Sequence, residues 1–182
     1  MCQFIETIHI ERGIIYNLDY HTNRMNRTRA VFWPEQPALE LSKYLYPVSS
    51  EGVMKCRVIY GREIEEITYT SYQIRPVHSL QIVYSDDIDY TYKSTDRSVI
   101  NELFARRQEQ DDILIVKNGL LTDTSIGNIA LFDGNEWYTP KQPLLKGTRR
   151  ASLLAMNLIK EKEITVERLF EYSQICSFNA MI

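Results

Sequence analysis

Lys93 is the side chain whose type and setting most directly suggest covalent chemistry. It follows a tyrosine-rich turn and precedes a predicted helix, in the segment Tyr92-Lys93-Ser94-Thr95-Asp96-Arg97. A lysine in such a place is usually a solvated charge. A buried lysine, however, has a lowered pKa, and its amine can attack an aldehyde to form a Schiff base. Lys93 is therefore a candidate nucleophile.

Asp123 is a candidate for holding a charged ring. It lies in Leu121-Thr122-Asp123-Thr124-Ser125, just after the turn signal Asn118-Gly119. The ordinary interpretation is a turn in which carboxylate and hydroxyl groups bond to their own backbone. The functional interpretation is a carboxylate that hydroxyl groups fix in place to hold a protonated ring nitrogen.

Two further features could hold a phosphate group. Residues 144–150 (Leu-Leu-Lys-Gly-Thr-Arg-Arg) precede a predicted helix, whose free N–H groups and glycine would allow an anion to approach. A helix start with nearby basic charge explains the same pattern, and neither the P-loop nor the Rossmann spacing is present. Arg24 lies one helical turn after His21, so the two share a helix face, and its guanidinium could bind a phosphate with two nitrogens. Arg27 and Arg29 are interpreted as solvated.

An amine, a carboxylate, a helix start and an arginine are together the parts that a pyridoxal 5′-phosphate (PLP) site needs. The cofactor carries an aldehyde, a ring nitrogen and a phosphate, and a protein meets these with a lysine, an acidic partner and an anion pocket. The combination predicts a PLP site more strongly than any single feature does.

The elements that must position these residues are mostly short strands. In the first half, alternating apolar and polar residues predict strands over 3–10, 53–60, 64–72 and 79–84. A hairpin turn at 11–13 leads into a return strand over 14–16. Helices are predicted over 18–31 and 38–46, each stopped by a following proline.

The second half predicts a helix over 97–108, two consecutive short hairpins, and a longer helix. The hairpins use strands over 113–116, 126–132 and 136–138, and the helix runs over 148–160. A strand over 164–166, a helical turn over 167–172 and a final strand over 174–182 follow. The chain is thus α+β without a βαβ repeat, and we expect domains over 1–85 and 86–182.

Composition excludes several classes of protein. The 182 residues are 44% hydrophobic and 25% charged, as in a globular chain, and the net charge of −3 argues against a nucleic-acid binder. No apolar run approaches the ~18 residues of a membrane span, and the N-terminus has no secretion signal. Three widely spaced cysteines and three histidines lack disulfide or metal-ligand spacing. We expect a cytoplasmic protein without metal.

Several ordered segments share their pattern with one known family. They are Phe4–Ile8, His21–Met25, Lys93–Arg97, Leu121–Asn128, Thr139-Pro140, Leu145–Arg150 and Ser177–Ala180. With these, the sequence resembles the class IV aminotransferase family, the fold-type IV PLP enzymes, over nearly its whole length. That family includes branched-chain and D-amino-acid aminotransferases and 4-amino-4-deoxychorismate lyase. Asp123 stands where the family has glutamate, and Arg149 where it has threonine.

The resemblance implies a role for each matched residue. Lys93 would form the internal aldimine with PLP and then act as general base and acid, and Asp123 would pair with the ring nitrogen. The phosphate would be held by Arg24, Gly147, Thr148, Arg149, Asn179 and Ala180. The implied fold is the D-amino-acid aminotransferase-like PLP fold: a small N-terminal α/β part plus a C-terminal pseudo-barrel part. The resemblance also implies a homodimer.

The resemblance leaves the reaction open. The Asn179-Ala180 ending favours 4-amino-4-deoxychorismate lyase, which eliminates pyruvate to give the p-aminobenzoate of folate biosynthesis. The alternatives are a class IV aminotransferase acting on another small amino substrate, and a non-catalytic PLP-binding member. A nucleotide-phosphate binder using residues 147–150 would stay colourless, whereas a PLP protein is yellow.

Overall fold

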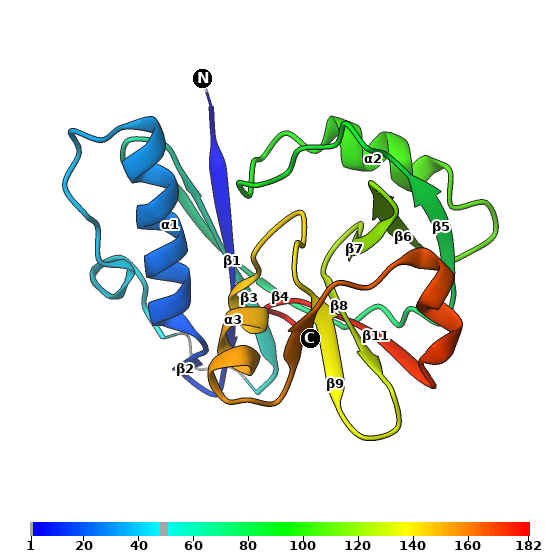
Figure 1. The fold of residues 1–182 in the computed structure, drawn as a ribbon. Helices are drawn as coiled ribbons and strands as arrows, with labels where there is room; N and C mark the ends of the chain where they lie inside the picture. Colours follow the sequence, from blue (N-terminus) through cyan, green and yellow to red (C-terminus); the bar gives the residue numbers. More distant parts are fainter. Residues whose placement is uncertain (1, 48–50) are drawn as a thin grey trace. The chain divides into compact units, whose positions relative to one another are not determined.

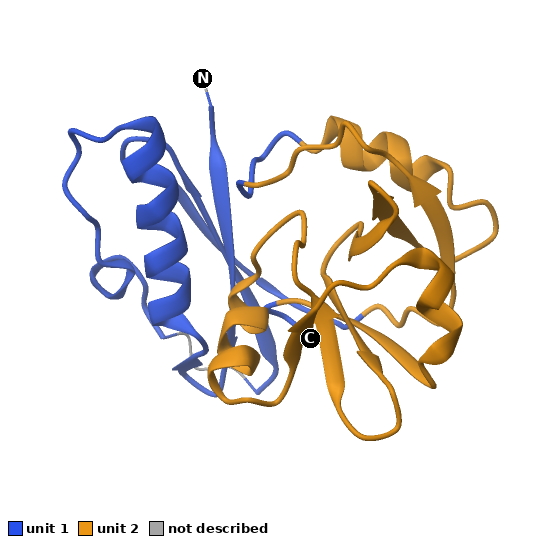
Figure 2. Ribbon diagram, viewed as in Figure 1, with its two compact units in different colours: residues 1–74, 92–96, 180–182 blue, residues 75–91, 97–179 orange. Residues whose placement is uncertain are grey.

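The computed structural model describes residues 2–47 and 51–182, and they form two compact units (Figures 1 and 2). Unit 1 consists of residues 1–74, 92–96 and 180–182, and unit 2 of residues 75–91 and 97–179. The predicted domain boundary at residue 85 falls within unit 2, and the division into domains stays a prediction.

Unit 1 contains an antiparallel sheet of four strands in the order β2-β1-β3-β4. The strands are β1 (Phe4–Glu11), β2 (Ile14–Ile15), β3 (Val53–Tyr60) and β4 (Ile64–Ser71). The turn between β1 and β2 places Arg12 at φ 50° and Gly13 at φ 76°. Two successive positive φ angles define the type I′ turn that matches the twist of a two-stranded ribbon.

The helix α1 (Leu18–Phe32) packs against this sheet (Figure 1). Its buried positions His21, Met25 and Thr28 recur at helical spacing, and Met25 joins Ile8 and Val58 in the core. The helix ends before Pro34, as the proline predicts. Core formation therefore fixes which face of α1 lies over β1, and the two polar residues His21 and Thr28 lie on that face.

Unit 2 contains a larger mixed sheet with the order β10-β9-β8-β7-β6-β5, to which β11 adds by pairing with β8. The strands are β5 (Leu80–Tyr84), β6 (Asp112–Lys117), β7 (Leu120–Thr124), β8 (Asn128–Phe132), β9 (Trp137–Pro140), β10 (Lys160–Lys162) and β11 (Gln174–Phe178). Strand β8 pairs with β7 at one end, with β9 at the other, and with β11 along its length. The sheet therefore branches at Asn128, where β8 pairs with β7 through Asp123 and with β11 through Phe178.

The apolar run Ile113–Val116 of β6 is buried on both faces. Ile113 and Ile115 pack with the helix α2 (Ser98–Ala105), whereas Leu114 and Val116 pack with β7 and β8. The remaining helical elements are α3 (Thr148–Ala155) and the 3₁₀ turns η1 (Leu41–Lys43) and η2 (Val166–Glu171).

The mixed helix and sheet architecture is confirmed, and most element predictions hold. The strands predicted over 3–10, 53–60, 64–72 and 79–84, and the helix predicted over 18–31, appear with ends shifted by at most a few residues. The helical turn over 167–172 is the 3₁₀ turn η2.

Two predicted helices are wrong in extent. Residues 38–46 form only the single 3₁₀ turn η1, which is enough to bury Leu41 and Leu45. The helix predicted over 148–160 ends at Ala155, because Asn157 takes φ 55° and the chain turns into β10. Of the apolar residues after that point, Met156 and Leu158 are exposed, and Ile159 is buried beyond the end of the helix.

The strand β7 was not predicted. Its residues Thr122, Asp123 and Thr124 are polar but buried, and the pattern therefore resembles a turn. Two other strands differ in extent: the final strand stops at Phe178 rather than at residue 182, and residues 164–166 contribute only an isolated bridge between Leu120 and Thr165. Within the described residues, no helix is both long and apolar enough to cross a membrane.

Candidate active site

The described part of unit 1 holds a buried cluster of charged side chains around Glu6. This carboxylate accepts hydrogen bonds from Arg24 Nε (2.9 Å) and Arg24 Nη2 (2.5 Å), and it lies 2.6 Å from His21 Nδ1. Glu6 and His21 are fully buried, and the Arg24 side chain is 13% exposed. Strand β1 and helix α1 thus supply one anion and one fixed cation to the same place.

Opposite forces act on the ionisation of this cluster. Burial raises the pKa of Glu6, but the Arg24 charge and the His21 hydrogen bond outweigh it and lower the pKa to about 2. Burial lowers the pKa of His21, and the hydrogen bond to Glu6 only partly restores it. A neutral His21 must therefore carry its hydrogen on Nδ1, because the Glu6 carboxylate can only accept.

Lys93 belongs to the same unit, within the short segment 92–96 that lies in the sequence between two stretches of unit 2. Its carbonyl accepts a hydrogen bond from Ile5 N (2.9 Å), and Ser94 forms a bridge with Phe4. The segment 92–96 therefore lies along β1, next to Glu6. The Lys93 side chain is half-buried, and its charge is close enough to lower the pKa of His21.

Unit 2 holds the second group of predicted residues, centred on Asp123. This side chain is 5% exposed, with Oδ1 accepting from Asn128 Nδ2 (2.7 Å) and Oδ2 accepting from Leu145 N (2.9 Å). Burial raises the pKa of Asp123 to about 6, against the lowering effect of these two donors. The pairing of β7 with β8 creates this contact, because Asp123 and Asn128 are register partners.

The glycine that precedes α3 is packed against the same cluster. A Cβ on Gly147 would overlap Oδ1 of Asn128 and lie 3.3 Å from its Cγ, so only glycine fits without displacing that side chain. After Gly147 the helix begins with buried Thr148 and half-buried Arg149. The N–H groups of this first turn and a closely approaching backbone are the features that favour an anion.

Arg150, the next residue of α3, has a structural contact instead. Its Nη2 donates to Pro140 O (2.8 Å) and to Glu161 Oε1 (2.7 Å). Its Nε is buried and has no hydrogen-bond partner in the described chain, and its charge helps lower the pKa of Asp123.

The last two predicted residues are divided between the units. Asn179 donates to Ile126 O (3.2 Å) in unit 2, and Ala180 belongs to unit 1. The structure therefore places Arg24, Lys93 and Ala180 in unit 1, whereas Asp123, Gly147, Thr148, Arg149 and Asn179 lie in unit 2.

Sequence reasoning missed two residues of these clusters. Glu6 appeared only as a matched motif, yet it occupies an inward position of β1 between Phe4 and Ile8, where a carboxylate needs a buried partner. The alternation of Phe4, Glu6 and Ile8 along the predicted strand could have indicated that Glu6 is buried. Asn128 also appeared only as a matched motif, and its contact with Asp123 depends on the unpredicted strand β7.

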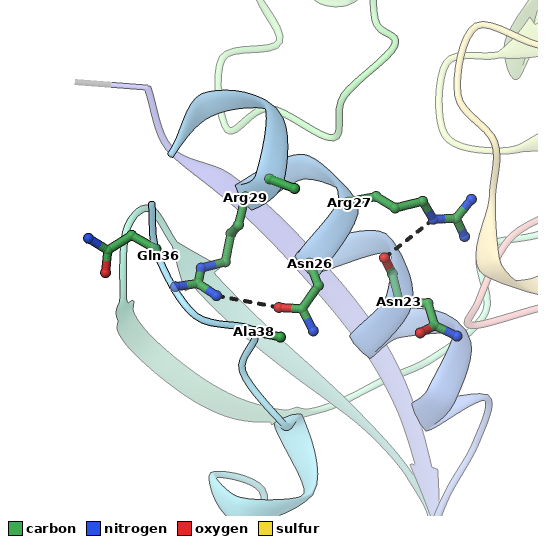
Figure 3. Close-up of a pocket in the computed structure, with 7 residues that line it drawn as sticks. Asn23, Asn26, Arg27, Arg29, Gln36 and Ala38 are labelled. Carbon is green, nitrogen blue, oxygen red and sulfur yellow. Dashed lines mark hydrogen bonds between the residues drawn. The ribbon is translucent and has the colours of Figure 1, made fainter. Parts of the chain in front are cut away.

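A surface pocket on unit 1 is lined by α1 and the segment that follows it (Figure 3). Within it the Arg29 guanidinium donates to Arg62 O (3.1 and 2.5 Å), Pro37 O (2.7 Å) and Asn26 Oδ1 (3.3 Å), and Arg29 is 1% exposed. The prediction that Arg29 is solvated is wrong, because these oxygens take the place of water. Arg27 is exposed, as predicted.

These residues fit PLP better than they fit a metal. The described residues contain no cluster of three or more His, Cys, Asp or Glu side chains that could hold a metal ion. They do contain the buried carboxyl of Asp123, which suits a ring nitrogen. Beside it α3 begins after Gly147, a position where a larger residue would overlap Asn128.

Several known proteins are similar to this chain in sequence or in fold. The chain is 38% identical, over 100% of its length and 98% of the relative's, to an uncharacterized protein of Haemophilus influenzae. The chain is also similar to a crystal structure from Haemophilus somnus 129PT, which is provisionally named 4-amino-4-deoxychorismate lyase. The two structures superpose with a TM-score of 0.95 at 34% sequence identity, and the match covers 100% of this chain and 97% of that chain. A Mycobacterium tuberculosis protein in PLP-bound form, provisionally named an aminotransferase, shares the fold at 16% identity and a TM-score of 0.75, with 98% of this chain and 77% of that chain covered.

The family model for amino-transferase class IV matches residues 3–182, which include all of the predicted site residues. The chain therefore belongs to the class IV aminotransferase family of PLP-dependent enzymes.

Proposed function

We propose that this chain binds PLP through Lys93 and acts on an amino-acid-like substrate, most specifically as a 4-amino-4-deoxychorismate lyase. The observation that carries the proposal is the buried Asp123 carboxyl, which Asn128 and Leu145 hold next to the glycine-led start of α3. A carboxyl of this kind is costly to bury unless a cationic partner balances it, and a protonated pyridine ring is such a partner.

Each predicted residue would meet one part of the cofactor. Lys93 would hold the aldehyde and Asp123 the ring nitrogen. The phosphate would be held by Arg24, Gly147, Thr148, Arg149, Asn179 and Ala180. When bound, PLP supplies an electron sink that weakens the bonds of the substrate carbon bearing the amine.

The chain's own residues would transfer a proton, keep the ring nitrogen protonated and orient the phosphate-binding arginine. The Lys93 amine would take the proton from the amine-bearing carbon of the substrate and return it to the product. Asp123, ionised above pH 6 or so, would keep a proton on the ring nitrogen. Glu6 would keep the Arg24 guanidinium from swinging into solvent, because it binds two of its nitrogens.

The lyase assignment draws on the Asn179-Ala180 ending and on the similarity to the Haemophilus somnus protein. The second candidate is an aminotransferase, the activity after which the family is named. Both reactions begin with the same proton removal. Purified protein with added PLP should release pyruvate and p-aminobenzoate from 4-amino-4-deoxychorismate. Amino transfer to 2-oxoglutarate without that release would favour the aminotransferase.

The covalent attachment is tested by borohydride reduction and peptide mapping. The wild type with PLP should become permanently labelled on the peptide that contains Lys93, and Lys93→Ala should lose the label and the activity. Lys141→Ala removes an exposed lysine and should keep both. A label that persists in Lys93→Ala would show that the lysine assignment is wrong.

The expected homodimer is part of the same proposal. Light scattering of the PLP-loaded protein should give twice the mass of the 21.4 kDa chain. A monomer with full activity would contradict it.

A further inference from the structure

Asn128 contacts both parts of the unit 2 cluster through a single side chain. It begins β8, is 5% exposed, and faces Asp123 across the β7–β8 pair. Its Nδ2 donates to Asp123 Oδ1 (2.7 Å) and to Leu145 O (2.8 Å). Both hydrogens of the amide are therefore engaged, one on the acid and one on the loop before α3.

The other end of the amide faces the start of α3. Oδ1 occupies the space that a Cβ of Gly147 would need. This oxygen cannot move aside cheaply, because rotation of the side chain would break both bonds of Nδ2. Leu145 reinforces the arrangement, since its N–H donates to Asp123 Oδ2 (2.9 Å) while its carbonyl accepts from Asn128.

We propose that Asn128 is a positioning residue that couples the ring-nitrogen partner Asp123 to the phosphate-binding loop at Gly147. The proposal rests on the proposed function, in which these two places hold the ring nitrogen and the phosphate of PLP. Asn128 orients the carboxylate by donation and sets the path of the loop by contact. A disturbance at either end therefore reaches the other through the amide.

An amide is the one group of this size that satisfies every contact. A carboxylate at position 128 would face the Asp123 carboxylate at hydrogen-bond distance, and two close carboxylates cannot both stay ionised. An alanine would leave Asp123 without a side-chain donor and would open space beside Gly147. These two variants therefore separate the electrostatic part of the role from the steric part.

The first test is a double-mutant cycle on PLP binding and on unfolding of the cofactor-free protein. Gly147→Ala alone should weaken PLP binding about tenfold or more, the size expected when one hydrogen bond to a charged group is lost. In the Asn128→Ala background the same change should cost little, since the space that it needs is then empty. Equal costs in both backgrounds would overturn the proposal.

The second test is spectroscopic and does not depend on turnover. In Asn128→Asp, a near-isosteric change, the pH midpoint of the visible absorption band of the PLP-loaded protein should move relative to wild type. Far-UV circular dichroism checks that the variant is folded, and Asn101→Ala, an exposed change on α2, should leave midpoint and affinity unchanged. An unmoved midpoint in Asn128→Asp would overturn the proposal.

The two proposals fail differently. A wild type that binds no PLP removes the proposed function and this inference with it. A wild type that binds PLP normally, with Asn128→Ala binding it equally well, overturns the inference alone.

Discussion

Replacing Asp123 with asparagine should change how the stability of the cofactor-free protein depends on pH. Burial raises the pKa of Asp123 from 3.8 to about 6, so the folded chain binds this proton more tightly than the unfolded chain does. The stability that the proton provides is complete below pH 4 and is lost as the pH rises through 6. A pKa difference of this size corresponds to about 3 kcal/mol.

The measurement is urea unfolding of cofactor-free wild type and Asp123→Asn at several pH values from 4 to 8. Relative to the variant, the wild type should lose about 2–3 kcal/mol of unfolding free energy across this range. The variant also carries a pH-independent cost of about 1–3 kcal/mol, because its amide cannot accept from both Asn128 and Leu145. Only the pH-dependent part tests the reasoning.

A matched control is Asp133→Asn in the exposed turn before β9. The N–H groups of Glu136 and Asn135 lower the pKa of Asp133, so its pH-dependent difference should have the opposite sign. A flat difference for Asp123→Asn, or one with the sign of the control, would refute the claim that burial governs this carboxyl.

Two further substitutions test other parts of the fold. Glu6→Gln should lower the unfolding free energy at pH 7 by about 3–5 kcal/mol, because Arg24 loses its buried anion. The deficit should shrink as the pH falls below 4.5 toward the low pKa of Glu6, and a variant as stable as wild type in urea would contradict it. Gly127→Ala should cost about 1–3 kcal/mol in thermal unfolding, because its Cβ would overlap the Phe178 carbonyl. Gly52→Ala, with open space around it, should melt like wild type, and equal losses would disprove the steric account.

The elements that the sequence predicted correctly are those whose burial follows a simple period. Strand β1 alternates buried and half-buried residues along most of its length, and α1 buries His21, Met25 and Thr28 at helical spacing. Turn chemistry was equally readable, since Arg12-Gly13 and Asn118-Gly119 both take the positive φ angles that their types favour.

The errors arose where distant contacts overrode the local pattern. Leu41 and Leu45 have helical spacing, but one 3₁₀ turn suffices to bury them. Arg29 looks like any surface arginine until the carbonyl groups of Pro37 and Arg62 surround it. Neither contact is visible in the sequence next to these residues.

The candidate site shows the same limit in a stronger form. The residue types at Lys93, Asp123 and Gly147 were informative because each carries distinctive chemistry. The strand β7 was not predicted because its polar residues Thr122, Asp123 and Thr124 are buried, and a pattern of apolar and polar residues places such a segment in a turn. The contacts of Asn128 with Asp123 and of Glu6 with Arg24 therefore became known only from the structure.

The interleaving of the two units constrains how this polypeptide can be made and divided. The chain passes from one unit to the other after residues 74, 91, 96 and 179. During translation the first sheet emerges early, but it must wait for Lys93 and finally for buried Met181 before its unit is complete. A fragment that ends at residue 85 would contain β1 but not Lys93, whose carbonyl accepts a hydrogen bond from Ile5 of that strand. Truncated expression products that lack one of these segments should therefore be poor guides to either unit.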